Sequence, residues 1–290
     1  MPANNSEYNT VVYPFFGGGI NNAQPATEIE DDECAEILNF EFDLSDDLKA
    51  RNGFIRYNLS PSFSSRITSI YNFITAAGTN NIIVTTAAEI YKDTLGVFSS
   101  IKGAVALPTN TYWQWAAFTD LAIGVNQQVG GAEKGIIKWS GAGNVVALAL
   151  TGILGTPDGA HSVAVFNNRL WVVFSSKPSR LYYSSLGNPE DWSTTGGFIE
   201  IGYDDGDKII GIKENRERLF IFKRRKTYSL TTGIGGVVNT DPDGWSVELL
   251  SGNVGCVSRY TIQTVLDDLL FLTDEGIASL KAVTEFGDFK

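Results

Sequence analysis

The stretch AVFNNRLWVV, residues 164–173, contains two apolar runs on either side of the pair Asn167-Asn168. Apolar runs of about four to eight residues predict β-strands, and two asparagines between such runs predict a tight turn. A third short run, Arg180–Tyr183, follows soon after the second. The sequence therefore predicts an antiparallel unit of at least three strands in this region.

The same unit recurs further along the chain. It reappears in Arg218–Leu230 and in Thr264–Leu280, where the last predicted strand is Gly276–Leu280. Weaker copies of the unit lie earlier in the chain, before residue 164. The second strand of each unit contains an apolar anchor, and the anchors are spaced by 39, 49, 49 and 50 residues: Ile82, Leu121, Leu170, Leu219 and Leu269. A period of roughly 40–50 residues with three or four strands per repeat is typical of β-propeller blades.

We therefore expect an all-β fold, a β-propeller of about five (or six) four-stranded blades over residues 61–290, with an extended N-terminal arm over residues 1–60. Ring closure is favourable because each twisted sheet buries its faces on its neighbours. The last repeat has three predicted strands, and Phe54–Tyr57 of the arm is a candidate for the missing clasp strand. An irregular β-sandwich array and an open arc of blades are the alternatives.

Charge separates the arm from the rest of the chain. The formal net charge is −11, from 33 acidic and 22 basic residues. Residues 1–48 contain eleven carboxylates and no Lys or Arg, so the remaining chain is electrically balanced. We expect the arm to be too polar to fold alone, with Gly17–Thr27 extended and flexible and Glu28–Phe42 forming a short helix or a strand. An acidic arm on a neutral body is predicted to lie on the body or on another subunit.

Composition excludes several classes of protein. A content of 43% hydrophobic residues excludes global disorder, and no apolar run approaches the roughly 18–20 residues that cross a bilayer. The first ten residues lack the pattern of a secretory signal, and Cys34 and Cys256 are too few for a disulfide framework. A net-negative chain without a basic domain is a poor candidate for nucleic-acid binding. We expect a soluble, reduced protein made inside the cell.

No catalytic motif, metal motif or cofactor motif is present, and we expect no enzyme activity and no cofactor. His161 is the only histidine, and its position after a turn predicts a surface or supporting role. The strings Asp204–Asp207 and Asp241–Gly244 are predicted to form turns. The alternatives are calcium ligation or a glycosidase-type pair of carboxylates, for which Asp158, Asp205 and Asp207 are the candidates.

One basic run, Lys223–Lys226, is predicted at the turn of a hairpin, where we expect its charges to stay solvated. Charge at such a position protects a sheet edge from pairing with other strands. A second interpretation is that the run is an electrostatic partner for an acidic surface, such as the arm. Nucleic-acid contact is a third interpretation, weakened by the scarcity of aromatic residues nearby.

Two groups of short motifs remain. The first begins with Gly18-Gly19-Ile20-Asn21, continues through Asn39-Phe40 and ends at Arg51–Phe54. The second runs from Val163–Phe166 through the blade motifs to Tyr228–Leu230. In this order, over residues 17–57 and 155–290, the chain resembles the tail nozzle and tail stabilisation proteins of T7-like and P22-like short-tailed bacteriophages. Members of that family are usually longer, so a compact member, a fragment and a relative that decorates a tail or vertex all stay open.

The resemblance implies a structural virion protein located in the phage tail and made in the host cytoplasm. It implies a ring of subunits, typically hexameric, in the nozzle or head–tail connector region, through which DNA passes. The implied partners are further copies of the chain and other tail or adaptor proteins, with no membrane span. Together with the charge pattern it gives candidate subunit-interface residues: Gly18, Gly19, Glu30, Asp31, Asp32, Glu33, Arg51, Lys223, Arg224, Arg225 and Lys226.

Two other classes of function compete with this expectation. The first is a carbohydrate-binding propeller module on a tail or capsid surface, with tryptophans as sugar platforms: Trp113, Trp115, Trp139, Trp171, Trp192 and Trp245. Most of these tryptophans lie in predicted strands, so core packing is the simpler interpretation. The second is an enzyme that uses the carboxylates named above.

Overall fold

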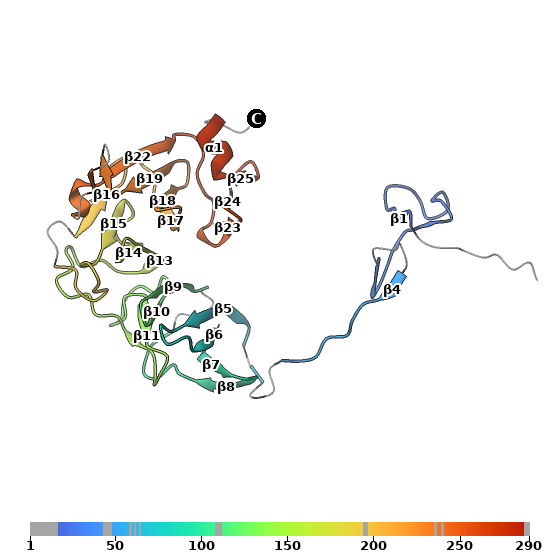
Figure 1. The fold of residues 1–290 in the computed structure, drawn as a ribbon, viewed down its shortest axis with the longest axis horizontal. Coiled ribbons are helices and arrows are strands. Elements are labelled where there is room, and N and C mark those ends of the chain that lie inside the picture. The colour runs from blue at the N-terminus through green and yellow to red at the C-terminus, as the bar shows by residue number, and fades with distance from the viewer. Residues whose placement is uncertain are drawn as a thin grey trace, which may run out of the picture. The chain divides into compact units, whose positions relative to one another are not determined.

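The structure is a computed structural model that describes residues 17–42, 48–57, 60, 62–63, 65–107, 112–193, 197–234, 237–238 and 241–286. The chain divides into two compact units, Met1–Tyr57 and Asn58–Lys290. The second unit is all-β apart from short helical segments, and its strands form five successive antiparallel sheets arranged as propeller blades (Figure 1). The predicted all-β propeller with five blades is thus confirmed.

Each blade is a meander of neighbouring strands, and the first strand of each is the innermost. The first two blades contain β5 (Ile67–Ile74), β6 (Asn80–Thr86), β7 (Ile90–Thr94), β8 (Val97–Ser100), β9 (Gln114–Phe118), β10 (Leu121–Val125), β11 (Ile136–Trp139) and β12 (Val146–Ala147). The third and fourth contain β13 (Ala160–Phe166), β14 (Arg169–Phe174), β15 (Arg180–Tyr183), β16 (Phe198–Glu200), β17 (Ile209–Asn215), β18 (Arg218–Lys223), β19 (Thr227–Thr231) and β22 (Ser246–Ser251). The fifth contains β23 (Gln263–Val265), β24 (Asp268–Leu272) and β25 (Ile277–Ser279).

The hairpin around Asn167-Asn168 forms as predicted. Strands β13 and β14 pair in antiparallel register down to Phe166 opposite Arg169. Asn167 and Asn168 then turn the chain with φ angles of 47° and 53°. Two successive positive φ angles match the twist of a two-residue β-hairpin, and asparagine tolerates this conformation better than most residues.

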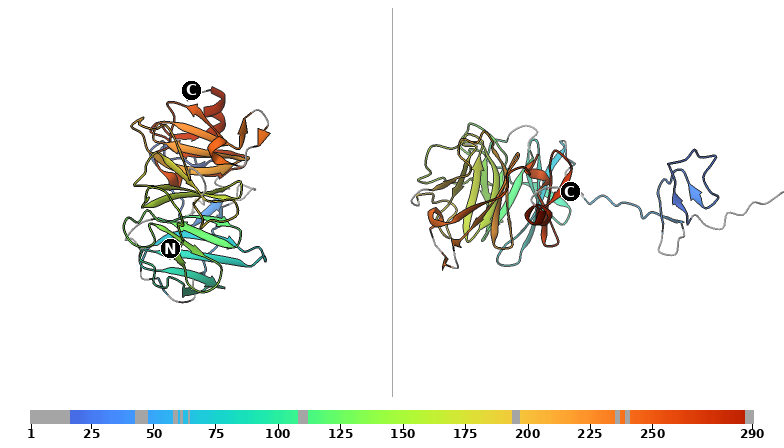
Figure 2. Two further views of the ribbon diagram at one scale, coloured as in Figure 1. Left: turned by 90° about the vertical axis from the view of Figure 1, so that its left-hand side faces the viewer. Right: turned by 90° about the horizontal axis from the view of Figure 1, so that it is seen from above.

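The core of the described residues consists of four apolar clusters, each between two successive blades. Trp139 and Phe73 lie between the first and second blades, and Trp192 lies between the second and third. The cluster between the third and fourth blades contains Trp171, and the next one contains Phe222. Seen from the side, the sheets of successive blades stand next to one another (Figure 2). Stability therefore comes from face-to-face packing of neighbouring blades.

The first and last blades differ from the others, because no apolar cluster of the described residues joins them. On β5 the side chains of Ile70 and Ile74 are exposed, while Phe73 on the opposite face packs toward the second blade. In the last blade Leu272 and Ile277 are paired in register and exposed, on the face opposite the buried core. We refer to these four exposed residues as the open seam. If the five blades of one chain closed into a circle, the fifth interface between neighbouring blades would lie at the open seam.

The last blade ends in a helix that was not predicted. The predicted strand over Gly276–Leu280 is confirmed for Ile277–Ser279, which form β25, and Leu280 begins helix α1 (Leu280–Phe286). Leu280 and Val283 are buried in the cluster between the fourth and fifth blades, so packing favours the helix. The candidate clasp strand Phe54–Tyr57 is wrong as a strand in this structure, because these residues are not in a strand, and they belong to the other unit.

The described residues of the arm contain two small sheets. Strands β1 (Gly19–Ile20) and β2 (Glu33–Cys34) pair in parallel, and β3 (Phe40–Phe42) pairs antiparallel with β4 (Leu48–Ala50). Gly19 and Ile20 are thus extended, as predicted for Gly17–Thr27, and they are paired in a sheet, while the expected flexibility stays a prediction. Within the described residues, no helix has the length and apolar character needed to cross a membrane.

Candidate functional site

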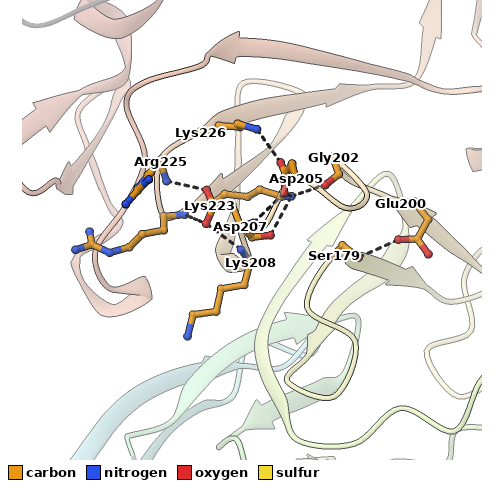
Figure 3. Close-up of polar contacts among 10 residues, drawn as sticks. Ser179, Glu200, Gly202, Asp205, Asp207, Lys208, Lys223, Arg225 and Lys226 are labelled. Atoms are coloured by element: carbon orange, nitrogen blue, oxygen red, sulfur yellow. Dashed lines mark hydrogen bonds and ion pairs between the residues drawn. The ribbon is translucent and has the colours of Figure 1, made fainter.

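The basic run Lys223–Lys226 lies at the turn between β18 and β19, as predicted. The expectation that its charges stay solvated is wrong for Lys223, whose side chain is fully buried. Its Nζ donates hydrogen bonds to the carbonyl oxygens of Gly202, at 2.9 Å, and Asp207, at 3.2 Å, and to Oδ1 of Asp205, at 2.7 Å (Figure 3). All three ammonium protons thus have acceptors, which is what a buried lysine requires.

Two carboxylates of the loop before β17 hold this turn. Asp205 also accepts a hydrogen bond from Nζ of Lys226 at 3.0 Å. Partial burial opposes ionisation of Asp205, but the two lysines outweigh it and lower the pKa of its carboxyl to about 2. Asp207 accepts from the backbone N–H groups of Arg224, at 3.1 Å, and Arg225, at 2.9 Å. We call Asp205, Asp207 and the run Lys223–Lys226 the carboxylate clamp.

The carboxylate clamp changes the interpretation of its members. Asp205 stays ionised and paired at neutral pH, which leaves it unsuited to act as a general acid. Nη2 of Arg224 forms an ion pair of 2.5 Å with Asp274, between β24 and β25, and so connects the fourth and fifth blades. Arg225 is the exposed residue of the run. Of the four basic interface candidates in the run, Arg225 is therefore the one best placed to contact another molecule, and Lys223 is excluded by burial.

The structure brings several acidic candidates and the glycine pair of the arm together. The backbone N–H of Gly18 donates to the carbonyl of Asp32 at 3.0 Å, and Gly19 is the register partner of Glu33. A Cβ on Gly18 would lie 2.7 Å from Cγ of Glu33, so the close approach requires glycine. The carboxylate of Glu33 accepts from Asn21 at 2.8 Å. These residues fold the arm locally.

The other candidate subunit-interface residues of the arm are exposed. Glu30 and Asp31 lie at the surface, and the guanidinium of Arg51 lies 4.4 Å from the ring centroid of Phe54. The described part of the arm also exposes six large apolar side chains: Ile20, Leu38, Phe40, Phe54, Ile55 and Tyr57. Phe54 and Ile55 are 83% and 97% exposed. Charge is the most obvious property of this arm in the sequence, whereas its unburied apolar surface is the stronger structural signal.

Five of the six tryptophans are buried, as core packing predicts: Trp113, Trp139, Trp171, Trp192 and Trp245. They provide no exposed sugar platform. Trp115 is partly buried and stacks between Tyr71 and Trp113, with ring centroids 5.8 and 5.4 Å apart. It lines a cavity of about 470 Å³ between the innermost strands, which we call the central cavity. Within the described residues, no three metal-binding side chains gather in one place.

A second cavity lies beside the central cavity, where β13 and β17 begin. It has a volume of about 330 Å³ and is lined by residues from the last four blades. His161 lies in its wall and is 7% exposed, so the predicted surface position is wrong. Its Nε2 lies 3.2 Å from the carbonyl oxygen of Ile209, and its Nδ1 lies 3.4 Å from Oγ of Ser175. Burial, followed by the nearby charge of Arg259, lowers the pKa of His161 to about 4.

His161 gives a pH dependence of stability. Its pKa is lower in the folded chain than the ordinary 6.5, so the unfolded chain binds the extra proton first. The free energy of unfolding should therefore fall by about 3 kcal/mol as the pH is lowered from 6.5 to 4. Urea unfolding in MES and piperazine buffers measures this, and His161→Gln should remove the slope in this window. An equal slope in the variant would contradict the assignment.

The chain matches no protein-family model and no curated protein. Among solved structures, it is similar to the extracellular domain of the putative hybrid two-component system BT4673 from B. thetaiotaomicron, with a TM-score of 0.50 and 10% identity. That match covers 78% of this chain and 27% of the other. The computationally designed Ika8 protein has a TM-score of 0.47 and 12% identity, with coverages of 77% and 61%.

A third structure is virginiamycin B lyase from Staphylococcus aureus, with a TM-score of 0.45, 13% identity and coverages of 75% and 71%. The chain spans less than two thirds of the length of the first two proteins. Sequence identities as low as these show a similarity of fold and nothing about function. By its fold the chain is a five-bladed β-propeller, and this fold does not by itself define an activity.

Proposed function

We propose that the chain is a structural subunit of a bacteriophage tail that forms a ring in the nozzle or head–tail connector region. One observation carries the proposal: the chain exposes two sets of apolar side chains, one on the arm and one at the open seam. Surfaces of this kind are typical of interaction sites. The resemblance of the arm and blade motifs to tail nozzle proteins supports the phage setting.

The two surfaces are suited to each other. Phe54 and Ile55 of the arm are exposed, and so are Ile70, at 67%, and Ile277, at 76%, at the open seam. Burying one such side chain contributes roughly 1.5–3 kcal/mol. We propose that the arm of one subunit covers the open seam of its neighbour. Contacts of this head-to-tail type generate a ring when the rotation between subunits closes.

The same proposal accounts for the acidic charge. The arm has eleven carboxylates in residues 1–48, and negative charge along a channel favours the passage of DNA without tight binding. The carbohydrate-binding alternative has no specific support, because the buried tryptophans provide no platform. The candidate carboxylate Asp205 is held in the carboxylate clamp, which gives the enzyme alternative no support either.

Mass photometry of the full chain tests the proposal. We expect a defined multiple of 31.5 kDa, the mass of one chain. The double variant Phe54→Ser/Ile55→Ser should be monomeric, and Ile277→Ser should be monomeric too, because each removes one side of the same contact.

Leu266→Asn is the matched control for these variants. Leu266 is 96% exposed and has a positive φ of 54°, where asparagine is well tolerated, but it lies at a turn outside the open seam. The control should assemble like the unmodified chain. A monomeric full chain, or variants that assemble normally, would overturn the proposal.

A further inference from the structure

Arg259 has a charge that no carboxylate of the described residues neutralises. It lies in the short 3-10 helix η2 (Arg259–Thr261) before β23, and its Nη2 donates to Oε1 of Gln127 at 2.9 Å and to Oη of Tyr260 at 2.5 Å. Both acceptors are uncharged. Its Nε is buried and has no hydrogen-bond partner. A guanidinium in this state lacks both a counter-charge and part of its hydrogen bonding.

The cavity of about 330 Å³ lies directly against this side chain. Its polar wall is formed by Gln127, His161, Ser175, Lys208, Ser258 and Arg259. Two of these residues are cations and none is an acid. Glu214 lines the adjoining central cavity but forms no ion pair with Arg259. The cavity is thus a polar recess with a positive charge in its wall.

His161 reports the same positive field. The charges of Arg259 and Lys208 both act to lower the pKa of its imidazole, in addition to burial. With its pKa lowered to about 4, the imidazole is neutral near pH 7 and adds no positive charge to the cavity. The cationic character of the cavity therefore comes from the two basic side chains.

We propose that this cavity is a binding site for a small oxyanion, a phosphate or a carboxylate, held by the guanidinium of Arg259. Arginine presents N–H groups in a rigid fork that matches two oxygens of such an anion. Cavities that hold small ligands have volumes of roughly 300–1,000 Å³, a range that includes this one. The ligand would supply the missing counter-charge. The residues that line this cavity are separate from those of the open seam.

The single histidine of the chain provides a direct test. In a tag-free protein, the imidazole proton resonances of His161 are followed by NMR during titration with sodium phosphate and, separately, sodium succinate, at constant ionic strength. We expect a saturable shift, with an increase in the pKa of His161 when the site is filled. No saturable shift with either anion, up to tens of millimolar, in a protein whose His161 starts with the low pKa of an empty site would overturn the proposal.

Two variants make the test specific. Arg259→Gln should weaken anion binding by about 10- to 100-fold, the effect of losing hydrogen bonds to a charged group. Arg225→Gln removes an exposed arginine on the basic turn and should bind like the unmodified chain. Thermal unfolding without anion shows whether each variant is folded. Equal binding by both variants would show that the anion interacts with general surface charge and would contradict the site.

The same resonance distinguishes two sources of the oxyanion. If a free metabolite fills the site, the assembled protein titrates with added phosphate or succinate as described above. If carboxylates of a neighbouring arm fill it, which rests on the proposed function, the assembled protein starts with a raised pKa of His161. Replacing Glu30, Asp31, Asp32 and Glu33 by their amides should then restore the low value. Both results support an oxyanion site at Arg259.

Discussion

Asp205→Asn is expected to lower the free energy of unfolding by about 3–5 kcal/mol. The reason is that Lys223 is fully buried and Asp205 is the carboxylate that pairs with it, at 2.7 Å. The amide keeps the size of the side chain but removes its charge, so an ammonium group is left in the interior without a counter-ion. Removal of one member of a buried ion pair is among the most destabilising single changes in proteins.

Urea unfolding followed by tryptophan fluorescence measures this loss. Asp204→Asn is the matched control, because Asp204 is exposed, directly precedes Asp205 and has a positive φ of 58° that asparagine also adopts. We expect it to change stability by no more than about 0.5 kcal/mol. Adding Lys223→Met to Asp205→Asn should restore most of the loss. A double variant as unstable as the single one would contradict the charge argument.

The carboxylate clamp also predicts a response to acid. The pKa of Asp205 is about 2 in the folded chain, below the ordinary value of 3.8. The resulting stability, on the order of 2 kcal/mol, is present above about pH 5 and is lost as the pH falls toward 2. The Asp205→Asn variant should lack this component. An unchanged acid response in the variant would show that another group causes it.

Gly255→Ala is expected to destabilise the chain by about 3 kcal/mol. A Cβ at this position would lie 2.4 Å from the carbonyl oxygen of Lys223 and 2.6 Å from the carbonyl carbon of Arg224. These are backbone atoms, so the clash cannot be relieved by rotating a side chain. The next residue, Cys256, donates its N–H to the same carbonyl of Lys223 at 2.8 Å. The substitution should therefore displace the turn that holds the carboxylate clamp.

Gly252→Ala is the matched control for this change. Gly252 lies in the same connection and has no positive φ, and a Cβ at this position would have no atom within 4 Å beyond its chain neighbours. Its replacement should be neutral or slightly stabilising, because alanine restricts the unfolded chain. Thermal unfolding of the two variants side by side measures the difference. Equal stabilities would show that the connection adapts and that the close approach at Gly255 is not required.

The strands were predictable where a buried face imposes a pattern. The runs around Leu170 and Leu219 are apolar because both faces of the second strand of a blade pack on neighbouring blades. The asparagine pair fixes the turn before the run at Leu170. Strand β8 at an outer edge is mostly exposed, and β12 has only two residues. Neither strand has an alternation of apolar and polar residues that could be recognised in the sequence. Helix α1 was missed because seven residues are too short for a clear helical pattern.

The chemistry of the charged residues was less predictable than the fold. The acids around Asp205 and the bases around Lys223 both stand out in the sequence, but their pairing depends on which loops the blade brings together. The same holds for Arg259, an isolated arginine in the sequence whose bond to Gln127 spans 132 residues. Local sequence gives residue type and turn position, whereas burial of a charge is a property of the tertiary structure.

The role of the basic turn is revised accordingly. The sequence suggested that Lys223–Lys226 receives the acidic arm of a neighbour, but the carboxylate clamp already engages Lys223 and Lys226 within the blade. The open seam offers the arm an apolar surface instead. In the proposed ring the apolar residues near Phe54 supply most of the binding energy, and the acidic residues contribute solubility and the character of the channel.

A cryo-EM reconstruction of the purified full chain tests the proposed ring most directly. We expect a closed ring in which residues 48–57 of each subunit lie against the open seam of the next subunit, in contact with Ile70 and Ile277. A monomeric particle, or a ring in which the arm lies away from the seam of every neighbour, would contradict the proposed assembly.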